Sequence, residues 1–290
     1  MTRCRWAQMA LAIATATALL TTGCGVTSGS YATAAPSSGT VYDRTVSART
    51  AQVEVVVHIA SPRASTYIVA DGQVDLSDAG CALTVFDAGT TVHELLSGRD
   101  LYIELPPRAR ATNGGKPWAV VELRSGRQVG PGVAPGSPLT EVDPGPVLAL
   151  LRLRPSAVSV VRQTTVAGQR VREFALSYAT ASLGRPGPDS TRAGGVLALI
   201  VQVASPKLKY LRVDVWLDRQ DRVVQLAAST TLDREPRSPS PAQAALANQL
   251  PTTLTVRVEL GGFGQPIDID WPVAADVARM PLSRLQAGLL

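Results

Sequence analysis

The stretch YLRVDVWLD, at residues 210–218, shows the pattern that decides the fold. Leucine and valine occupy every second position from Leu211 to Leu217, and mostly charged side chains fill the positions between them. Side chains that alternate along an extended chain point to opposite faces of a sheet, so this period of two predicts a strand with one buried face. A turn is expected at residues 218–221, and the alternation returns from Val223.

The same alternation recurs at short intervals along most of the chain. The predicted strands are 52–59, 67–76, 81–86, 91–96, 101–105, 118–123, 157–166, 170–178, 210–218, 223–231 and 252–260, and residues 265–269 are expected to end the sheet. Turns rich in glycine and aspartate separate them, and Asp71-Gly72 is expected to bend or divide the second strand. Short strands at near-regular spacing, with little helix between them, predict a mainly β (α+β) fold of about ten to eleven strands in an antiparallel meander.

Helix signals are few. Asp143 precedes Pro144 and an apolar run, which is typical of a helix start, and we expect a helix over residues 143–153. Residues 196–203 fit a strand or a buried helix equally well. The remaining expectations are loops at 106–117, 125–138 and 183–195, one or two helical turns at 242–249, and a weakly helical tail from 272.

The N-terminus has the features of an export signal. Two arginines precede an uncharged apolar run at residues 9–20, which is too short to span a bilayer core of roughly 30 Å. The sequence LTTGC at residues 20–24 resembles a bacterial lipobox, with Thr21 where an aliphatic residue is usual. It predicts cleavage before Cys24 and a lipid anchor on Cys24, which would hold the protein on the extracytoplasmic face of the cell membrane. The alternative is an ordinary signal peptide cut nearby, with a free Cys24.

Composition and motifs argue against several classes of function. The formal net charge is +5, but no block of lysine and arginine indicates a nucleic-acid surface. The two histidines, His58 and His93, fall on separate predicted strands and lack zinc-ligand spacing. No G-x-S-x-G or S-x-x-K motif supplies a nucleophile. We therefore predict no catalytic residue, no metal and no cofactor.

Two pairs of aspartates and one cysteine are expected to have structural roles and no role in a functional site. Asp218 and Asp221 are expected to shape a hairpin turn, because the set lacks the other ligand positions of a calcium loop. Asp268 and Asp270 are expected on a solvated strand face. Cys81 is expected to be a small buried apolar side chain, because once Cys4 leaves with the signal and Cys24 carries lipid it has no disulfide partner.

The most informative feature is the aliphatic face of the predicted strands. Its side chains are branched or small, which suits acyl chains because these need width and no directional contacts. Two explanations stay open: a filled core packed against helices, or a wall that a lipid covers. The predicted lining residues are Val53, Val55, Val57, Ile68, Ala70, Val74, Leu83, Val85, Leu101, Ile103, Val213, Val215, Leu254, Val256 and Val258.

Several short motifs resemble those of the LppX/LprG/LprA group of actinobacterial lipoproteins, whose fold is LolA-like. The motifs are GRDLY at 98–102, KPW at 116–118, Asp143-Pro144, the strands 171–178 and 213–218, and FGQPIDI at 263–269. The resemblance implies a strongly curved antiparallel half-barrel sheet, with a few helices across its concave side and a hydrophobic cavity for acyl chains. It also implies transport of lipid, lipoprotein or glycolipid within the cell envelope.

These expectations divide the chain into four segments. We expect a lipoprotein signal peptide at 1–23, a flexible tether at 24–45, a LolA-like lipid-binding domain at 46–275 and a C-terminal tail at 276–290. The first hypothesis is an envelope lipoprotein whose partners are acyl lipid or glycolipid and, through its anchor, the membrane. The second is a membrane-anchored module that binds or senses another protein and has a filled core. An enzyme built from Asp, Glu, Tyr or Ser alone is the weakest hypothesis.

Overall fold

The computed structural model describes residues 35–60, 65–77, 80–87, 89–98, 100–122, 144–183, 210–231 and 253–281. All of them belong to the unit formed by residues 35–290. Predictions on the signal peptide, Cys24, the first part of the tether, and the segments 125–138, 196–203 and 242–249 lie outside the described residues.

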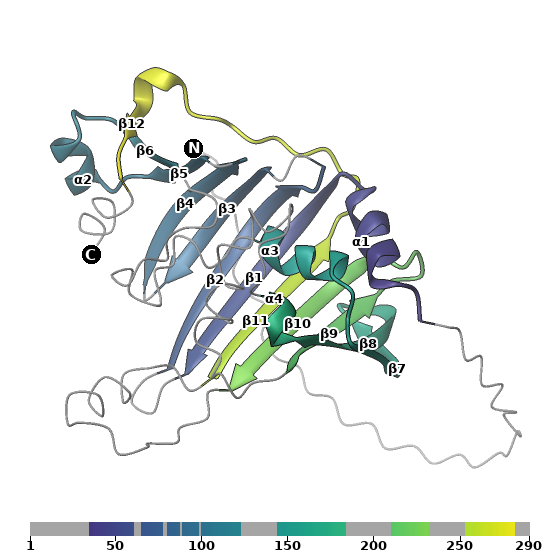
Figure 1. The fold of residues 1–290 in the computed structure, drawn as a ribbon. Coiled ribbons are helices and arrows are strands. Elements are labelled where there is room, and N and C mark those ends of the chain that lie inside the picture. Colours follow the sequence, from purple (N-terminus) through teal and green to yellow (C-terminus); the bar gives the residue numbers. More distant parts are fainter. Residues whose placement is uncertain are drawn as a thin grey trace, which may run out of the picture. The chain divides into compact units, whose positions relative to one another are not determined.

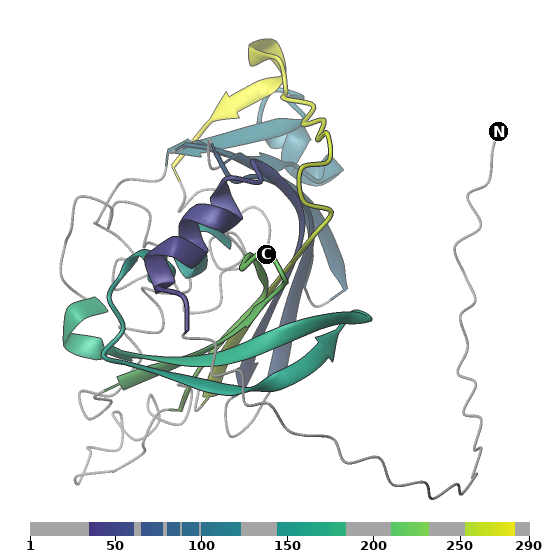
Figure 2. The same ribbon diagram turned by 90° about the vertical axis from the view of Figure 1, so that its right-hand side faces the viewer.

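Within the described residues, twelve strands form one sheet in the order β12-β6-β5-β4-β3-β2-β1-β11-β10-β9-β8-β7. The strands are β1 Thr50–Ala60, β2 Ser65–Asp75, β3 Gly80–Asp87, β4 Thr90–Ser97, β5 Asp100–Glu104, β6 Trp118–Glu122, β7 Ala157–Val166, β8 Gln169–Ala179, β9 Tyr210–Leu217, β10 Val223–Thr231, β11 Thr253–Gly261 and β12 Val277–Arg279. All neighbours are antiparallel except β12, which runs parallel to β6. The sheet is strongly curved and does not close, as Figures 1 and 2 show. The predicted fold class is confirmed, with twelve strands where about ten to eleven were expected.

The centre of the sheet joins distant parts of the chain. Strand β1 pairs with its sequence neighbour β2 and also with β11, so that Val55 lies opposite both Ala70 and Val258. Each pair is antiparallel and in continuous register, which keeps the aliphatic residues of all three strands on one face. The β1–β11 pairing therefore merges the two halves of the meander into a single sheet.

Gly72 does not divide β2, and the expected bend is wrong. The strand runs unbroken from Ser65 to Asp75, with Gly72 paired to Val53 on one side and Leu83 on the other. A Cβ atom on Gly72 would lie 1.9 Å from the backbone oxygen of Ala82. The glycine is needed because two backbones approach closely here.

The described helices are short. They are α1 Ser38–Val46, α2 Pro107–Thr112, α3 Pro144–Ala149, the 3-10 turn η2 Leu150–Arg152, α4 Thr180–Leu183 and the 3-10 turn η4 Ala274–Asp276. Figure 2 shows α1, in purple, lying inside the curve of the sheet. In this part of the chain, no helix is long and apolar enough to cross a membrane.

The structure corrects three expectations. Helix α1 occupies the end of the segment predicted as a tether, because Ser37 caps it and Val41 and Thr45 are buried. Helix α2 forms within the predicted loop 106–117, with Pro107 in its first turn. Residues 265–269 form no strand; the sheet ends instead with β12, in the predicted tail.

Polar contacts hold α1 against the sheet. The Thr45 hydroxyl donates to the carbonyl of Val41 at 2.8 Å and accepts the backbone N–H of Val223 at 3.0 Å. Arg44 of the helix and Arg172 of β8 both pair with Asp221 in the turn between β9 and β10. Helix α1 is therefore part of the folded unit.

The turn at Asp218 forms as predicted. The Asp218 carboxylate accepts the backbone N–H groups of Gln220 at 2.8 Å and Arg222 at 2.9 Å. It also accepts Nε of Arg222 at 2.8 Å, and its side chain is only 2% exposed. The buried Asp218 carboxylate thus accepts hydrogen bonds from two backbone N–H groups of the turn and from the Arg222 guanidinium.

Replacing Asp218 with alanine is expected to lower the free energy of unfolding by about 2 kcal/mol, because the turn N–H groups and Arg222 lose their acceptor. Urea denaturation followed by circular dichroism measures the change. Asp214→Ala is the control, because its pairing with Arg212 is largely exposed and should contribute less than about 1 kcal/mol. Equal losses in the two variants would contradict the role given to Asp218.

Candidate functional site

The structure brings the fifteen predicted lining residues together on one face of the sheet. Each is at most 5% exposed, and all belong to one hydrophobic cluster. Val215 shares a pocket with Val41 of α1 and Leu151 of η2, and Figure 2 shows α1 on the inner side of the curve. The face they form is therefore the concave one, and contact of these residues with a ligand remains a prediction.

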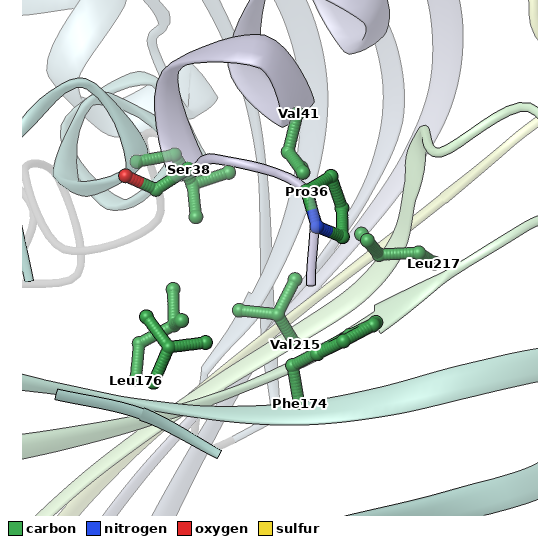
Figure 3. Close-up of a pocket in the computed structure, with 9 residues that line it drawn as sticks. Pro36, Ser38, Val41, Phe174, Leu176, Val215 and Leu217 are labelled. Atoms are coloured by element: carbon green, nitrogen blue, oxygen red, sulfur yellow. The ribbon is translucent and has the colours of Figure 1, made fainter. Parts of the chain in front are cut away.

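A small pocket lies where this face meets α1 and η2. Its volume is about 10 Å³, which is room for about one water molecule. Figure 3 shows the side chains of α1 and of strands β8 and β9 converging on it. The lining residues are Pro36, Ser38, Val41, Leu151, Val158, Phe174, Leu176, Val215 and Leu217. This end of the concave face is nearly filled by the protein itself.

Of the predicted lining residues, Val215 is the one that borders this pocket. The sequence analysis missed the others for different reasons. Val41 lay in the predicted tether, and Leu151 lay in the helix expected to cover the cavity but was not named as a lining residue. The alternation of Phe174 and Leu176 along β8 was the signal that could have added those two residues.

Helix α3 and η2 form where the Asp143-Pro144 signal predicted a helix. Leu150 and Leu151 are buried in the core. The Ser38 hydroxyl donates to the carbonyl of Leu153 at 3.1 Å, and the Arg152 guanidinium lies 5.4 Å from the ring centre of Tyr42. These contacts join α1 to η2 across the concave face.

Among the described residues, three buried polar groups without a hydrogen-bond partner interrupt the aliphatic surface. Oε1 of Glu94, the hydroxyl of Tyr178 and Oγ1 of Thr230 are buried and have no hydrogen-bond partner. Burial raises the pKa of Glu94 from 4.5 to about 8, and burial also raises the pKa of Tyr178. Both side chains are therefore uncharged at neutral pH. The sequence analysis identified none of the three as a site residue.

The two histidines lie apart, as expected. Nε2 of His58, in β1, is 2.8 Å from Oγ of Ser65, and the ring stacks on Tyr67. His93, in β4, is exposed and lies 3.9 Å from Glu104. Across the described part of the chain, no three His, Cys, Asp or Glu side chains gather as metal ligands.

The structure also places Cys81, Asp268 and Asp270, the remaining residues that the sequence analysis considered. Cys81 is 3% exposed and belongs to the hydrophobic cluster, as predicted. Asp268 and Asp270 do not share a strand face, because residues 262–276 contain no strand. The backbone N–H of Asp268 donates to Oε1 of Gln73 at 3.3 Å.

The fold and the site together define a class of protein: an open, curved antiparallel sheet with an aliphatic concave face beneath short helices. No protein-family model matches the chain, and no curated protein sequence matches it. Among solved structures, the chain is similar to the lipoprotein LppX of Mycobacterium tuberculosis, with 10% identity and a TM-score of 0.42 over 80% of this chain and 98% of LppX.

Two further structures are similar. LprF of Mycobacterium bovis is 12% identical, with a TM-score of 0.37 over 83% of this chain and 99% of LprF. A putative outer membrane lipoprotein-sorting protein domain from Vibrio parahaemolyticus is 10% identical, with a TM-score of 0.23 over 79% of this chain and 94% of the domain. The expected resemblance to the LppX group is thus found, but at these low identities and TM-scores nothing about a ligand passes to this chain.

Proposed function

We propose that this protein binds the acyl chains of a lipid or glycolipid on the concave face of its sheet. The observation that carries the proposal is the extent of that face: buried aliphatic residues extend from β5 through β1 and β11 to β9. An apolar surface of this size is stable only when it is removed from water. Acyl chains provide an apolar cover that needs no directional partner.

The described helices are too short to cover the whole face. Helix α1 has nine residues and is about 14 Å long. Twelve strands spaced about 4.8 Å apart span about 50 Å along the curve of the sheet. Within the described residues, α1, α3 and η2 therefore cover only part of the width of the concave face, and the burial of its side chains depends on other groups as well.

The proposal includes the membrane anchor. Lipidation of Cys24 would place the domain on the extracytoplasmic face of the cell membrane, next to a supply of acyl lipid. The protein would then carry lipid within the cell envelope rather than modify it.

Native mass spectrometry of the full chain tests the proposal, with Ala70→Phe as the blocking variant. Ala70 lies on the concave face between Val55 and Val85, so a phenyl ring there would occupy the space of an acyl chain. The wild-type chain should carry extra mass that fragments as acyl lipid, and Ala70→Phe should lower its occupancy at least about tenfold. Val69→Phe is the matched control, because it adds the same ring to the opposite face of β2.

A melting curve for each variant separates blocking from unfolding, since an overpacked site costs about 1–3 kcal/mol. Loss of lipid from a variant that melts as a cooperative unit supports the proposal. A wild-type chain that carries no lipid and binds none when phospholipid and glycolipid are added would refute it.

The nearly filled pocket beneath α1 favours one other function, a membrane-anchored module that binds another protein and has no ligand. That function predicts a chain that stays free of lipid in the same experiment. It also predicts a protein partner captured by cross-linking in intact cells.

A further inference from the structure

Glu94 is a single carboxyl group in an aliphatic part of the concave face. In β4 it lies opposite Leu83 of β3 and Ile103 of β5, and the next residues on its own face of the strand are Val92 and Leu96. The residue is 4% exposed, although a leucine would suit these neighbours better. The position therefore holds a polar group where packing alone favours an apolar one.

The carboxyl group has no partner among the described residues to offset its burial. Its Oε1 makes no hydrogen bond, and no ion pair involving Glu94 is found among the described residues. The nearby charged side chains His93, Glu104 and Arg110 contact one another on the opposite face of the sheet. A buried acceptor or donor without a partner costs about 1–3 kcal/mol, so a ligand that supplies one gains that free energy on binding.

We infer that Glu94 binds the polar end of the ligand, and that this end is an uncharged hydroxyl or ester group. The inference rests on the proposed binding of acyl chains to the same face. A protonated carboxyl both donates and accepts a hydrogen bond, which matches an ester carbonyl or a hydroxyl. Among the described residues, an anionic head would meet no cation beside Glu94, and a cationic head would require an ion pair in apolar surroundings.

Thr230, another unpartnered polar group of this face, lies far from Glu94. Thr230 of β10 belongs to a row of paired residues that includes Leu254 of β11. Glu94 belongs to another row, which crosses the sheet through Leu83, Gly72 and Val53 and reaches β11 at Leu260. Six residues of extended chain separate those two rows, or roughly 20 Å. The concave face therefore has a polar position at Glu94 and an aliphatic surface beyond it, as a single-headed lipid requires.

A comparison of ligands that share one hydrocarbon chain and differ at the polar end tests the inference. The full chain is incubated separately with monooleoylglycerol, oleate and cis-9-octadecene, and the ligand that stays with the protein after gel filtration is extracted and quantified by gas chromatography. The wild-type chain should prefer monooleoylglycerol to cis-9-octadecene. Glu94→Leu should lose that preference by about tenfold, the equivalent of one hydrogen bond to a buried group.

Two variants serve as controls. Glu94→Gln keeps a donor and an acceptor at the same place and should keep most of the preference. Thr230→Val removes a different buried hydroxyl from the same face and should leave the preference unchanged. Melting curves show whether each variant is folded.

The outcomes separate this inference from the proposed function. If Glu94→Leu keeps the wild-type preference for monooleoylglycerol over the hydrocarbon, or if oleate binds more tightly than monooleoylglycerol, the role of Glu94 is overturned while acyl binding stands. If the wild-type chain retains none of the three ligands, the binding of acyl chains itself is refuted.

Discussion

Gly72→Ala is expected to destabilise the fold by about 3 to 5 kcal/mol, because the added methyl group has no room. Its Cβ would lie 1.9 Å from the carbonyl oxygen of Ala82 and 3.0 Å from Cα of Leu83. Both are backbone atoms in the middle of β3, so the β2–β3 pairing would have to separate locally. Chemical denaturation of the full chain measures the loss as a fall in the transition midpoint.

Gly261→Ala provides the matched control. Gly261 also lies in a strand of the sheet, and a Cβ there would meet nothing within 4 Å. Alanine restricts the unfolded chain more than glycine does, so this variant should be neutral or more stable by up to about 1 kcal/mol. If the two variants unfold at the same denaturant concentration, β2 and β3 do not approach as closely as described.

The stability of the protein should fall as the pH rises through the range in which Glu94 titrates. Burial raises the pKa of Glu94 from 4.5 to about 8, so between these values the folded state holds a proton that the unfolded state has lost. A state that binds more protons is favoured at low pH. The contribution of Glu94 is therefore most favourable below pH 4.5, is lost progressively up to about pH 8, and is constant above it.

The full effect corresponds to about 5 kcal/mol across this interval. Glu94→Gln removes the titrating group and keeps the shape of the side chain, so the difference in unfolding free energy between wild type and variant isolates its contribution. Urea denaturation of both proteins at several pH values should show their stabilities converging at low pH. Parallel pH profiles would mean that the carboxyl group is hydrated in the folded protein.

The local elements were predictable because their signals lie within a few residues of each other. The hairpin of β7 and β8 turns at Ala167 and Gly168, with φ values of 46° and 79°. Left-handed backbone at both positions suits a two-residue hairpin loop, and the alternation on either side indicates the strands. The strand β9 and its turn at Asp218 were recognised in the same way.

Gly72 shows where local signals fail. An Asp-Gly pair within an alternating stretch is typical of a break, and the sequence analysis expected it to bend or divide the strand. The same glycine also satisfies a close approach between paired strands, and only the position of Ala82 in β3 distinguishes the two cases. The parallel pairing of β12 with β6 is equally non-local, because Val277 lies opposite Trp118.

For this protein, the sequence by itself determined strands β1 to β11, most of their turns and the aliphatic face, because alternation is a property of neighbouring residues and burial follows from it. The tertiary structure decided the pairing of β1 with β11, the position of α1 inside the curve, and the isolation of Glu94. Whether a buried glutamate has a partner depends on side chains brought near it from other strands. The local sequence around β4 does not contain that information.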